Sequence, residues 1–94
     1  MNEAVIVATA RSPIGRAVKG SLVDLRPDDM SAQIVRALMD KVPEVSGDHV
    51  EDLIMGSGQP AGEAGFNVGR VVSVRAGLEQ VPGVTVNRYC SSSL

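Results

Sequence analysis

The sequence predicts an α/β fold, with a βαβαβ order in which a parallel-rich sheet packs between helices. Two observations lead to this prediction. Short runs of β-branched residues alternate with segments of helical periodicity, and Gly or Pro residues separate them. The chain has 94 residues, 44% of them apolar, which fits one small globular domain better than a disordered chain.

The first half of the chain predicts one strand and one helix. Residues 4–8 are β-branched and apolar on both faces, as in a buried parallel strand, and Pro13 breaks the run that follows. The helix is indicated by apolar residues at a spacing of four, namely Met30, Ile34, Leu38 and Val42. We expect Asp28 or Asp29 to cap its start and Pro43 to lie just past its end.

The second half predicts two more strands and another helix. One strand is centred on residues 52–55, and a Gly-rich loop follows it. The valines of residues 67–77 favour a strand, but Asn67 and Gly77 fit the two ends of a helix, so we expect a helix there. The third strand is "GVTVNRY", residues 83–89, and a further helix is expected to begin at the serines that follow.

Charge, aromatic content and cysteine content exclude several classes of protein. A net charge of −2 and only two aromatic residues, Phe66 and Tyr89, argue against a nucleic-acid partner. A single cysteine forms no internal disulfide, which favours a reducing compartment. The first apolar run is too short for a signal peptide or a membrane span. We therefore expect a cytoplasmic protein.

The stretch "GSGQPA", residues 56–61, matches a dinucleotide-binding fingerprint, and it follows a predicted strand. The fingerprint needs a helix that opens directly on those glycines, so that its N-terminus faces a pyrophosphate. Here Pro60, Gly62 and Gly65 delay any helix to about Asn67. We therefore interpret the stretch as a flexible loop between a strand and a helix.

Cys90 is the only cysteine, and a lone cysteine is most often a small buried hydrophobe. Its position favours another interpretation. It follows a predicted parallel strand, and α/β folds place reactive groups at the carboxyl ends of such strands. It also precedes a predicted helix, whose dipole favours a thiolate and whose free N–H groups are placed to bind an oxyanion. The three serines after it fit helix capping.

The segment "VPGVTVNRYCSSSL", residues 81–94, resembles the nucleophile segment of the thiolases, the acetyl-CoA acetyltransferases and 3-ketoacyl-CoA thiolases. That family shows V-P-x-x-T-V-N, a variable pair, and then C-[GS]-S-G-L. Residues 5–16, "VIVATARSPIGR", are similar to its first strand and turn, with Ser12 in place of Thr. Residues 50–78, "VEDLIMGSGQPAGEAGFNVGRVVSVRAGL", are similar to its second strand, Gly-rich loop and helix start. The resemblance covers the whole chain.

One departure from the family pattern lies beside the nucleophile. Ser93 stands where the family usually has Gly, which tightens the space near Cys90 and affects the acyl group that is accepted. The double serine directly after Cys90 is more similar to degradative than to biosynthetic thiolases.

The resemblance implies that residues 1–94 are the amino-terminal part of a thiolase N-terminal domain, ending just after the nucleophilic cysteine. The CoA-binding loop domain and the carboxyl half, with a catalytic histidine, an asparagine and a second cysteine, would lie outside this segment. His49 matches no family position and is interpreted as solvent-facing. Arg11, Asn67 and Arg70 match positions that we take as structural. Residues 1–94 alone are expected to be inactive.

The activity implied by the resemblance is CoA-dependent cleavage of a 3-ketoacyl-CoA, or the reverse Claisen condensation, through an acyl group on Cys90. Acyl-CoA and coenzyme A are substrates, and neither a resident cofactor nor a metal is implied. The resemblance also implies a bacterial cytoplasmic enzyme of fatty acid metabolism. We expect it to be a dimer or tetramer in which the third strand, residues 84–89, lies at the interface between subunits. Two alternatives remain: a ketoacyl synthase or 3-hydroxy-3-methylglutaryl-CoA synthase type of condensing enzyme, and a non-catalytic thiolase-like protein that binds lipid or partners.

Overall fold

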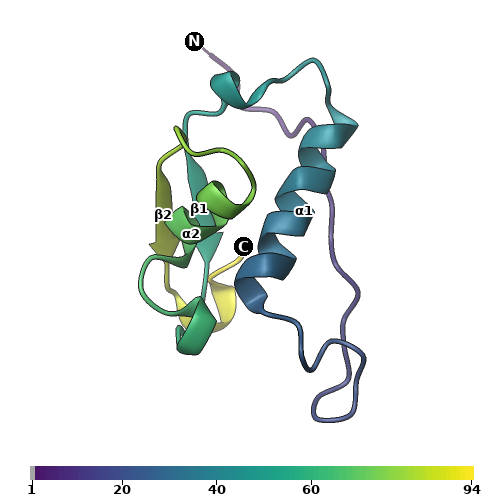
Figure 1. The fold of residues 1–94 in the computed structure, drawn as a ribbon. Helices are drawn as coiled ribbons and strands as arrows, with labels where there is room; N and C mark the ends of the chain where they lie inside the picture. Colours follow the sequence, from purple (N-terminus) through teal and green to yellow (C-terminus); the bar gives the residue numbers. More distant parts are fainter. Residues whose placement is uncertain (1) are drawn as a thin grey trace.

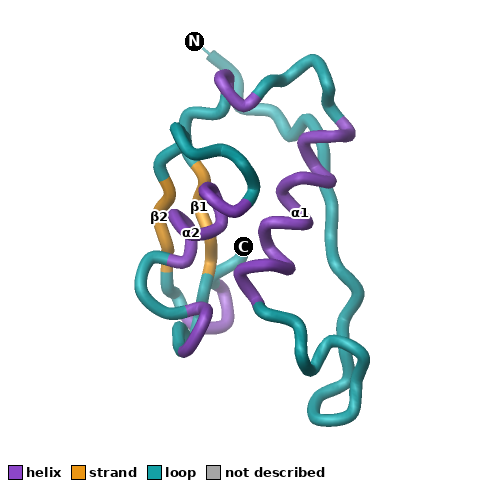
Figure 2. Tube along the Cα trace, viewed as in Figure 1, coloured by secondary structure: helices purple, strands orange, loops and turns teal. Residues whose placement is uncertain are grey.

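The computed structural model of the chain describes residues 2–94 (Figures 1 and 2). Two α-helices, two strands and three short 3-10 turns make up the regular structure of this part. In chain order they are α1 (Pro27–Lys41), η1 (Gly47–His49), β1 (Leu53–Gly56), η2 (Gly62–Ala64), α2 (Val68–Arg75), β2 (Gly83–Val86) and η3 (Tyr89–Ser91). None of the helices in residues 2–94 is long and apolar enough to cross a membrane.

The centre of the fold is a β-α-β unit. β1 and β2 pair in parallel, in a register that runs from Leu53 opposite Gly83 to Gly56 opposite Val86. α2 connects the two strands and packs on one face of the sheet, and α1 packs against α2. The predicted α/β class is therefore confirmed, and so is the choice of helix over strand for residues 67–77.

The predicted first strand, residues 4–8, does not form. These residues are irregular and pair with no strand within residues 2–94, and Ile6 is 87% exposed. Further along, the same segment runs beside α1, where Lys41 Nζ donates to the Thr9 carbonyl at 2.7 Å (Figure 1). Strand propensity measures how well side chains pack on a sheet, so β-branched residues without a neighbouring strand stay irregular.

The sheet is covered on one face only within residues 2–94. Side chains of one face, such as Thr85, point to α2, whereas Ile54 on the other face is 66% exposed. Val84, its partner in the parallel register, is also exposed. Of the layers expected from the sequence, helices cover one face of the sheet, and the other face is apolar and exposed within residues 2–94.

α1 begins two or three residues earlier than the sequence suggests. Its N-cap is Arg26, and no side chain caps it, so the predicted cap by Asp28 or Asp29 is wrong. The reason is Pro27, whose fixed φ and missing N–H suit the first helical position. The helix ends at Lys41, before Pro43, as predicted.

The apolar stripe of α1 is half-buried, and the core contacts are made by its neighbours on the helix. The core cluster consists of Ala32, Ala76, Leu78 and Val81, with Val35, Val50 and Leu53 packed against it. Met30 and Ile34 instead line a hollow against the irregular segment near Ala10. The stripe predicts the helix correctly, but it faces an irregular segment instead of a sheet.

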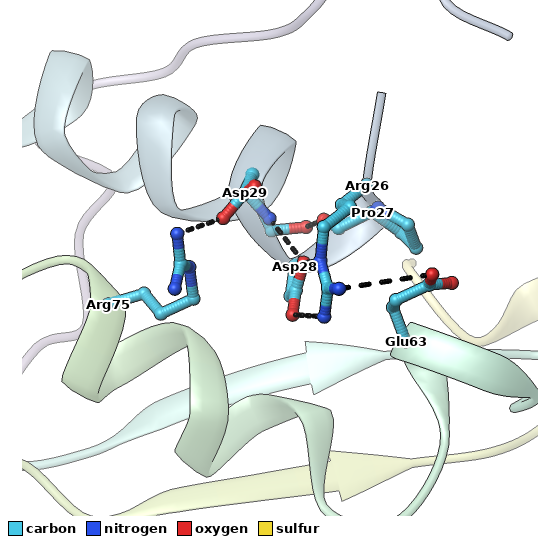
Figure 3. Close-up of polar contacts among 7 residues, drawn as sticks. Arg26, Pro27, Asp28, Asp29, Glu63 and Arg75 are labelled. Atoms are coloured by element: carbon cyan, nitrogen blue, oxygen red, sulfur yellow. Dashed lines mark hydrogen bonds and ion pairs between the residues drawn. The ribbon is translucent and has the colours of Figure 1, made fainter. Parts of the chain in front are cut away.

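Three ion pairs lie at the start of α1, and two of them join it to other elements (Figure 3). Arg26 binds the carboxylate of Asp28 in a bidentate manner, with N···O distances of 3.1 and 3.0 Å. Its other terminal nitrogen lies 4.0 Å from Glu63 in η2. Asp29 pairs with Arg75 at the end of α2. Asp28 is only 4% exposed, so its charge depends on Arg26 for compensation.

We expect the Asp28 pair to stabilise the fold at neutral pH and to stop doing so in acid. The hydrogen bond from Arg26 holds the pKa of the Asp28 carboxyl below its ordinary value of 3.8. Because the folded-state pKa is the lower one, the contribution is present above about pH 4 and is lost as the pH falls through the folded value. Asp28→Asn should therefore lower the melting temperature of the full-length protein at neutral pH. Calorimetry in acid should show a smaller difference in melting temperature between the variant and the unsubstituted protein. An equal difference at neutral and at acid pH would contradict this role of Asp28.

The N-terminus of α2 is tied to β2 by side chains. Asn67 is the N-cap: its Oδ1 accepts from the Arg70 N–H at 3.4 Å, and its Nδ2 donates to the Gly83 carbonyl at 2.9 Å. Thr85 Oγ1 donates to Asn67 Oδ1 at 2.8 Å and accepts from the Gly69 N–H at 3.0 Å. A Cβ on Gly69 would overlap the carbonyl oxygen of the neighbouring strand, so the helix backbone sits directly on β2.

The far end of α2 also agrees with the sequence. Gly77 adopts φ +81°, a left-handed conformation that suits glycine after the last helical residues. Both caps of this helix were predicted from residue type alone, and both are confirmed.

Thr85→Val should weaken this junction. The substitution keeps the shape of the side chain but leaves the Gly69 N–H without its acceptor, which costs about 1–3 kcal/mol in stability. Thr9→Val is the matched control, because Thr9 is exposed and its hydroxyl takes part in none of the hydrogen bonds found among residues 2–94. Denaturant unfolding of both variants measures the difference, and equal losses would contradict the capping role.

Candidate active site

Cys90 lies in η3, and its side chain is exposed. The chain reaches this turn from the carboxyl end of β2, close to the C-terminus (Figures 1 and 2). The sequence predicts this location, but it places the end of the preceding strand at Tyr89. In the structure β2 ends at Val86, and an irregular link leads to the turn. Because the thiol is exposed within residues 2–94, the common alternative for a lone cysteine, a small buried hydrophobe, does not describe it there.

The α-helix predicted to begin at the serines is not formed, and one 3-10 turn stands in its place. Four residues follow Cys90 in this sequence, which are too few for a stable helical nucleus. The serines bond to the turn itself. Ser91 Oγ donates to the Arg88 carbonyl at 3.0 Å, and Ser92 Oγ donates to the Tyr89 carbonyl at 2.7 Å. Ser91 and Ser92 thus bond to backbone carbonyls of the turn, but the helix that the serines were expected to cap does not form.

The backbone around Cys90 is held on both sides of the residue. The Tyr89 N–H donates to Asn87 Oδ1 at 2.9 Å, and the Arg88 N–H donates to Ser92 Oγ at 2.8 Å. Tyr89 has φ +51°, a left-handed conformation that is uncommon outside glycine and asparagine. Among the hydrogen bonds found within residues 2–94, none is donated by the Cys90 N–H.

Two glycines at the end of β1 form the surface on which this turn rests. A Cβ on Gly56 would overlap the Ser92 carbonyl oxygen, and a Cβ on Gly58 would lie 2.8 Å from the Tyr89 carbonyl oxygen. The Ser57 N–H donates to the Val86 carbonyl at 3.0 Å and continues the sheet to this point. The turn that carries Cys90 therefore packs backbone to backbone on "GSG".

This packing explains the motif that resembles a dinucleotide fingerprint. The next helical residues along the chain after those glycines are the three of η2, and α2 begins only at Val68. The interpretation as a loop is confirmed for residues 57–61, whereas Gly56 is the last residue of β1. The glycines are needed because another backbone approaches them, which is a second common reason for glycine at such a place.

A cavity of about 290 Å³ opens beside the thiol. It is lined by Gly58, Gln59, Tyr89 and Cys90. Larger hollows, of about 530 and 520 Å³, lie along residues 12–30 and between α1 and Arg75, and neither is lined by a cysteine. The chemically relevant cavity is thus the smaller one next to Cys90.

The other sequence candidates lie away from this cavity. His49 is exposed, as expected, and its Nδ1 accepts from the Ser46 N–H at 3.1 Å within η1. Arg70 donates to the Glu79 and Val81 carbonyls at 2.8 and 2.9 Å, which is a structural role. Arg11 is exposed beside the end of α1. Within residues 2–94 no group of three His, Cys, Asp or Glu side chains could hold a metal ion.

Sequence reasoning missed the walls of the site. Gln59 and Tyr89 line the cavity, and nothing in their residue types or spacing indicated this. Gly56 and Gly58 were detectable in principle, because two glycines directly after a predicted strand indicate a close backbone approach.

An exposed cysteine on a tight turn at the carboxyl edge of a parallel sheet defines an α/β protein with a candidate thiol nucleophile. The model of the thiolase N-terminal domain matches residues 4–94. The chain is 47% identical to a 3-ketoacyl-CoA thiolase of Bacillus subtilis and 41% identical to those of Shewanella frigidimarina and Pseudoalteromonas translucida. Each match covers 100% of this chain and 24% of the relative. The chain belongs to the thiolase family and spans about a quarter of the length of these relatives.

Proposed function

We propose that the chain is the amino-terminal part of an acyl-CoA C-acyltransferase, a thiolase, in which Cys90 is the acyl-carrying nucleophile. The observation that carries the proposal is the place of Cys90: an exposed thiol on a turn held against Gly56 and Gly58. Family membership supports the acyl-transfer chemistry, and the name of the relatives, 3-ketoacyl-CoA thiolase, favours it over the other condensing enzymes.

In the first half-reaction, the Cys90 thiolate attacks the C3 carbonyl carbon of a 3-ketoacyl-CoA and a C–S bond forms. The C2–C3 bond then breaks, and its electron pair passes to C2 as the enolate of acetyl-CoA, which takes up a proton. In the second half-reaction, the thiolate of coenzyme A attacks the acyl carbonyl and displaces Cys90 Sγ. Covalent catalysis thus divides one difficult step into two easier ones.

The turn contributes to this chemistry through its backbone. The Cys90 N–H is proposed to stabilise the oxyanion of each tetrahedral intermediate, a contact worth about 3–4 kcal/mol in other acyl transfers. The neighbouring amides donate within the turn, as the Tyr89 N–H does to Asn87. The proton acceptor for the thiol, by family resemblance a histidine, and the second cysteine that serves C2 are proposed to lie outside residues 1–94.

The proposal is tested by trapping the acyl group. Full-length protein is incubated with a 3-ketoacyl-CoA without free coenzyme A, digested and mapped by mass spectrometry. The shortened acyl group should be found on the peptide that contains Cys90. An acyl group on another residue, or none on the protein, would overturn the assignment.

We also propose that the protein is a homodimer or tetramer, joined through β2, in the cytoplasm of a bacterium. Within residues 2–94 the outer edge of β2 pairs with no strand, and an open edge carries unpaired backbone groups that natural proteins cover. Val84 and Val86 add an exposed apolar surface to this edge. Light scattering of the full-length protein at micromolar concentration should give at least twice the monomer mass, and a monomer would contradict the proposal.

A further inference from the structure

Of the four residues around the cavity at Cys90, two have side chains that could meet a substrate, namely Gln59 and Tyr89. We propose that Tyr89, with Gln59, limits the length of the acyl chain carried on Cys90 and makes short acyl groups the preferred substrate class. This inference rests on the proposed function, because it concerns the acyl group of the same nucleophile.

The first reason is that the position of Tyr89 is fixed at its backbone and free at its ring. Its N–H donates to Asn87 Oδ1 at 2.9 Å, and its carbonyl accepts from Ser92 Oγ at 2.7 Å. Gly58 lies against the same carbonyl. The side chain is nevertheless 74% exposed. A large ring with an anchored backbone, directly before the nucleophile, is placed to contact whatever the thiol carries.

The second reason is size. The cavity measures about 290 Å³, which is near the lower limit of roughly 300–1,000 Å³ for sites that hold drug-sized ligands. The hollow is open, and an acyl chain that extends from Cys90 along it would meet the Tyr89 ring, so a short acyl thioester is proposed to fit beside the ring and a longer chain to displace it. Gln59 adds a polar amide to the same cavity, which disfavours an extended apolar chain there.

Phe66 provides an internal comparison, because it shares the other features of Tyr89. Phe66 and Tyr89 are the two aromatic residues of the sequence. Phe66 is 100% exposed, and its backbone is also left-handed, with φ +53°. It precedes the cap of α2 but does not line the cavity of Cys90. A change at Phe66 therefore tests the effect of removing an exposed aromatic ring without touching the acyl site.

The test compares two substrates in the full-length enzyme, 3-ketohexanoyl-CoA and 3-ketodecanoyl-CoA. The measured quantity is the ratio of kcat/KM for the longer substrate to that for the shorter one. Tyr89→Ala should raise this ratio about tenfold or more, because wrongly sized apolar groups are discriminated at that level. Gln59→Ala should raise it in the same direction. Tyr89→Phe and the control Phe66→Leu should leave the ratio within about twofold.

A ratio keeps the test informative even if a variant loses part of its activity, because a folding defect lowers both rates together. An unchanged ratio in both Tyr89→Ala and Gln59→Ala would overturn the inference while leaving the proposed function intact, provided that Cys90 is still acylated. Failure to acylate Cys90 in the unsubstituted protein would instead overturn the proposed function, and this inference with it.

Discussion

Cys90→Ala in the full-length protein is expected to abolish thiolysis of 3-ketoacyl-CoA, with a fall in kcat of about 10⁴-fold or more. Alanine cannot form the acyl thioester, so both half-reactions lose their intermediate. The measurement is the CoA-dependent disappearance of a 3-ketoacyl-CoA. Cys90→Ser should be almost as inactive, because an alcohol held in the same position is a much weaker nucleophile than a thiolate.

The fold should not change in the Cys90→Ala variant. The Cys90 side chain is exposed, and surface substitutions of this kind usually alter stability by less than about 0.5 kcal/mol. A melting temperature close to that of the unsubstituted protein therefore separates loss of chemistry from loss of structure. Activity within about tenfold of the original in the alanine variant would remove Cys90 from the mechanism.

The parts of the fold that were predictable from the sequence are those with local causes. The valines of α2 left the choice between helix and strand open. Asn67 and Gly77 nevertheless identify both ends of the helix, because capping depends on a few neighbouring residues. The stripe of α1 has the same local character. The start of α1 has a local cause too, because Pro27 suits the first helical position, and the prediction of an Asp cap overlooked this signal.

The prediction of a first strand was wrong for a non-local reason. Residues 4–8 have a strand composition, but a strand needs a partner edge, and within residues 2–94 this segment pairs with neither β1 nor β2. Which edge is available is decided by the packing of the whole sheet, and no pattern within five residues contains that information.

The residues of the candidate site also differ in whether their positions have local or non-local causes. Cys90 could be placed because strand–turn–cysteine is a local pattern with known chemical consequences. Gln59 and Tyr89 could not be placed, because they are about thirty residues apart and meet only through the parallel register of β1 and β2. Register is a property of the folded sheet, so the walls of the cavity became visible only in the structure.

The same register makes Gly56 the residue on which the site depends most for its shape. A Cβ at this position would overlap the carbonyl oxygen of Ser92, with the adjoining carbonyl carbon and the Ser93 nitrogen also too close. All three atoms belong to the backbone, so no side chain can rotate away to make room. Gly56→Ala must therefore push the turn that carries Cys90 away from β1.

We expect Gly56→Ala to destabilise the full-length protein by about 3 kcal/mol or more, which is at the upper end for overpacking, and to slow acylation of Cys90. The matched control is Gly62→Ala. Gly62 has φ +54°, but no atom lies within 4 Å of the place that an added methyl group would take, so its substitution adds only the left-handed backbone penalty of roughly 1–2 kcal/mol. Unfolding free energies and the rate of acyl-Cys90 formation compare the two variants. Because the Gly62 variant carries backbone strain without a clash, a Gly56 variant that lost no more stability or acylation than this control would show that the turn does not rest on β1.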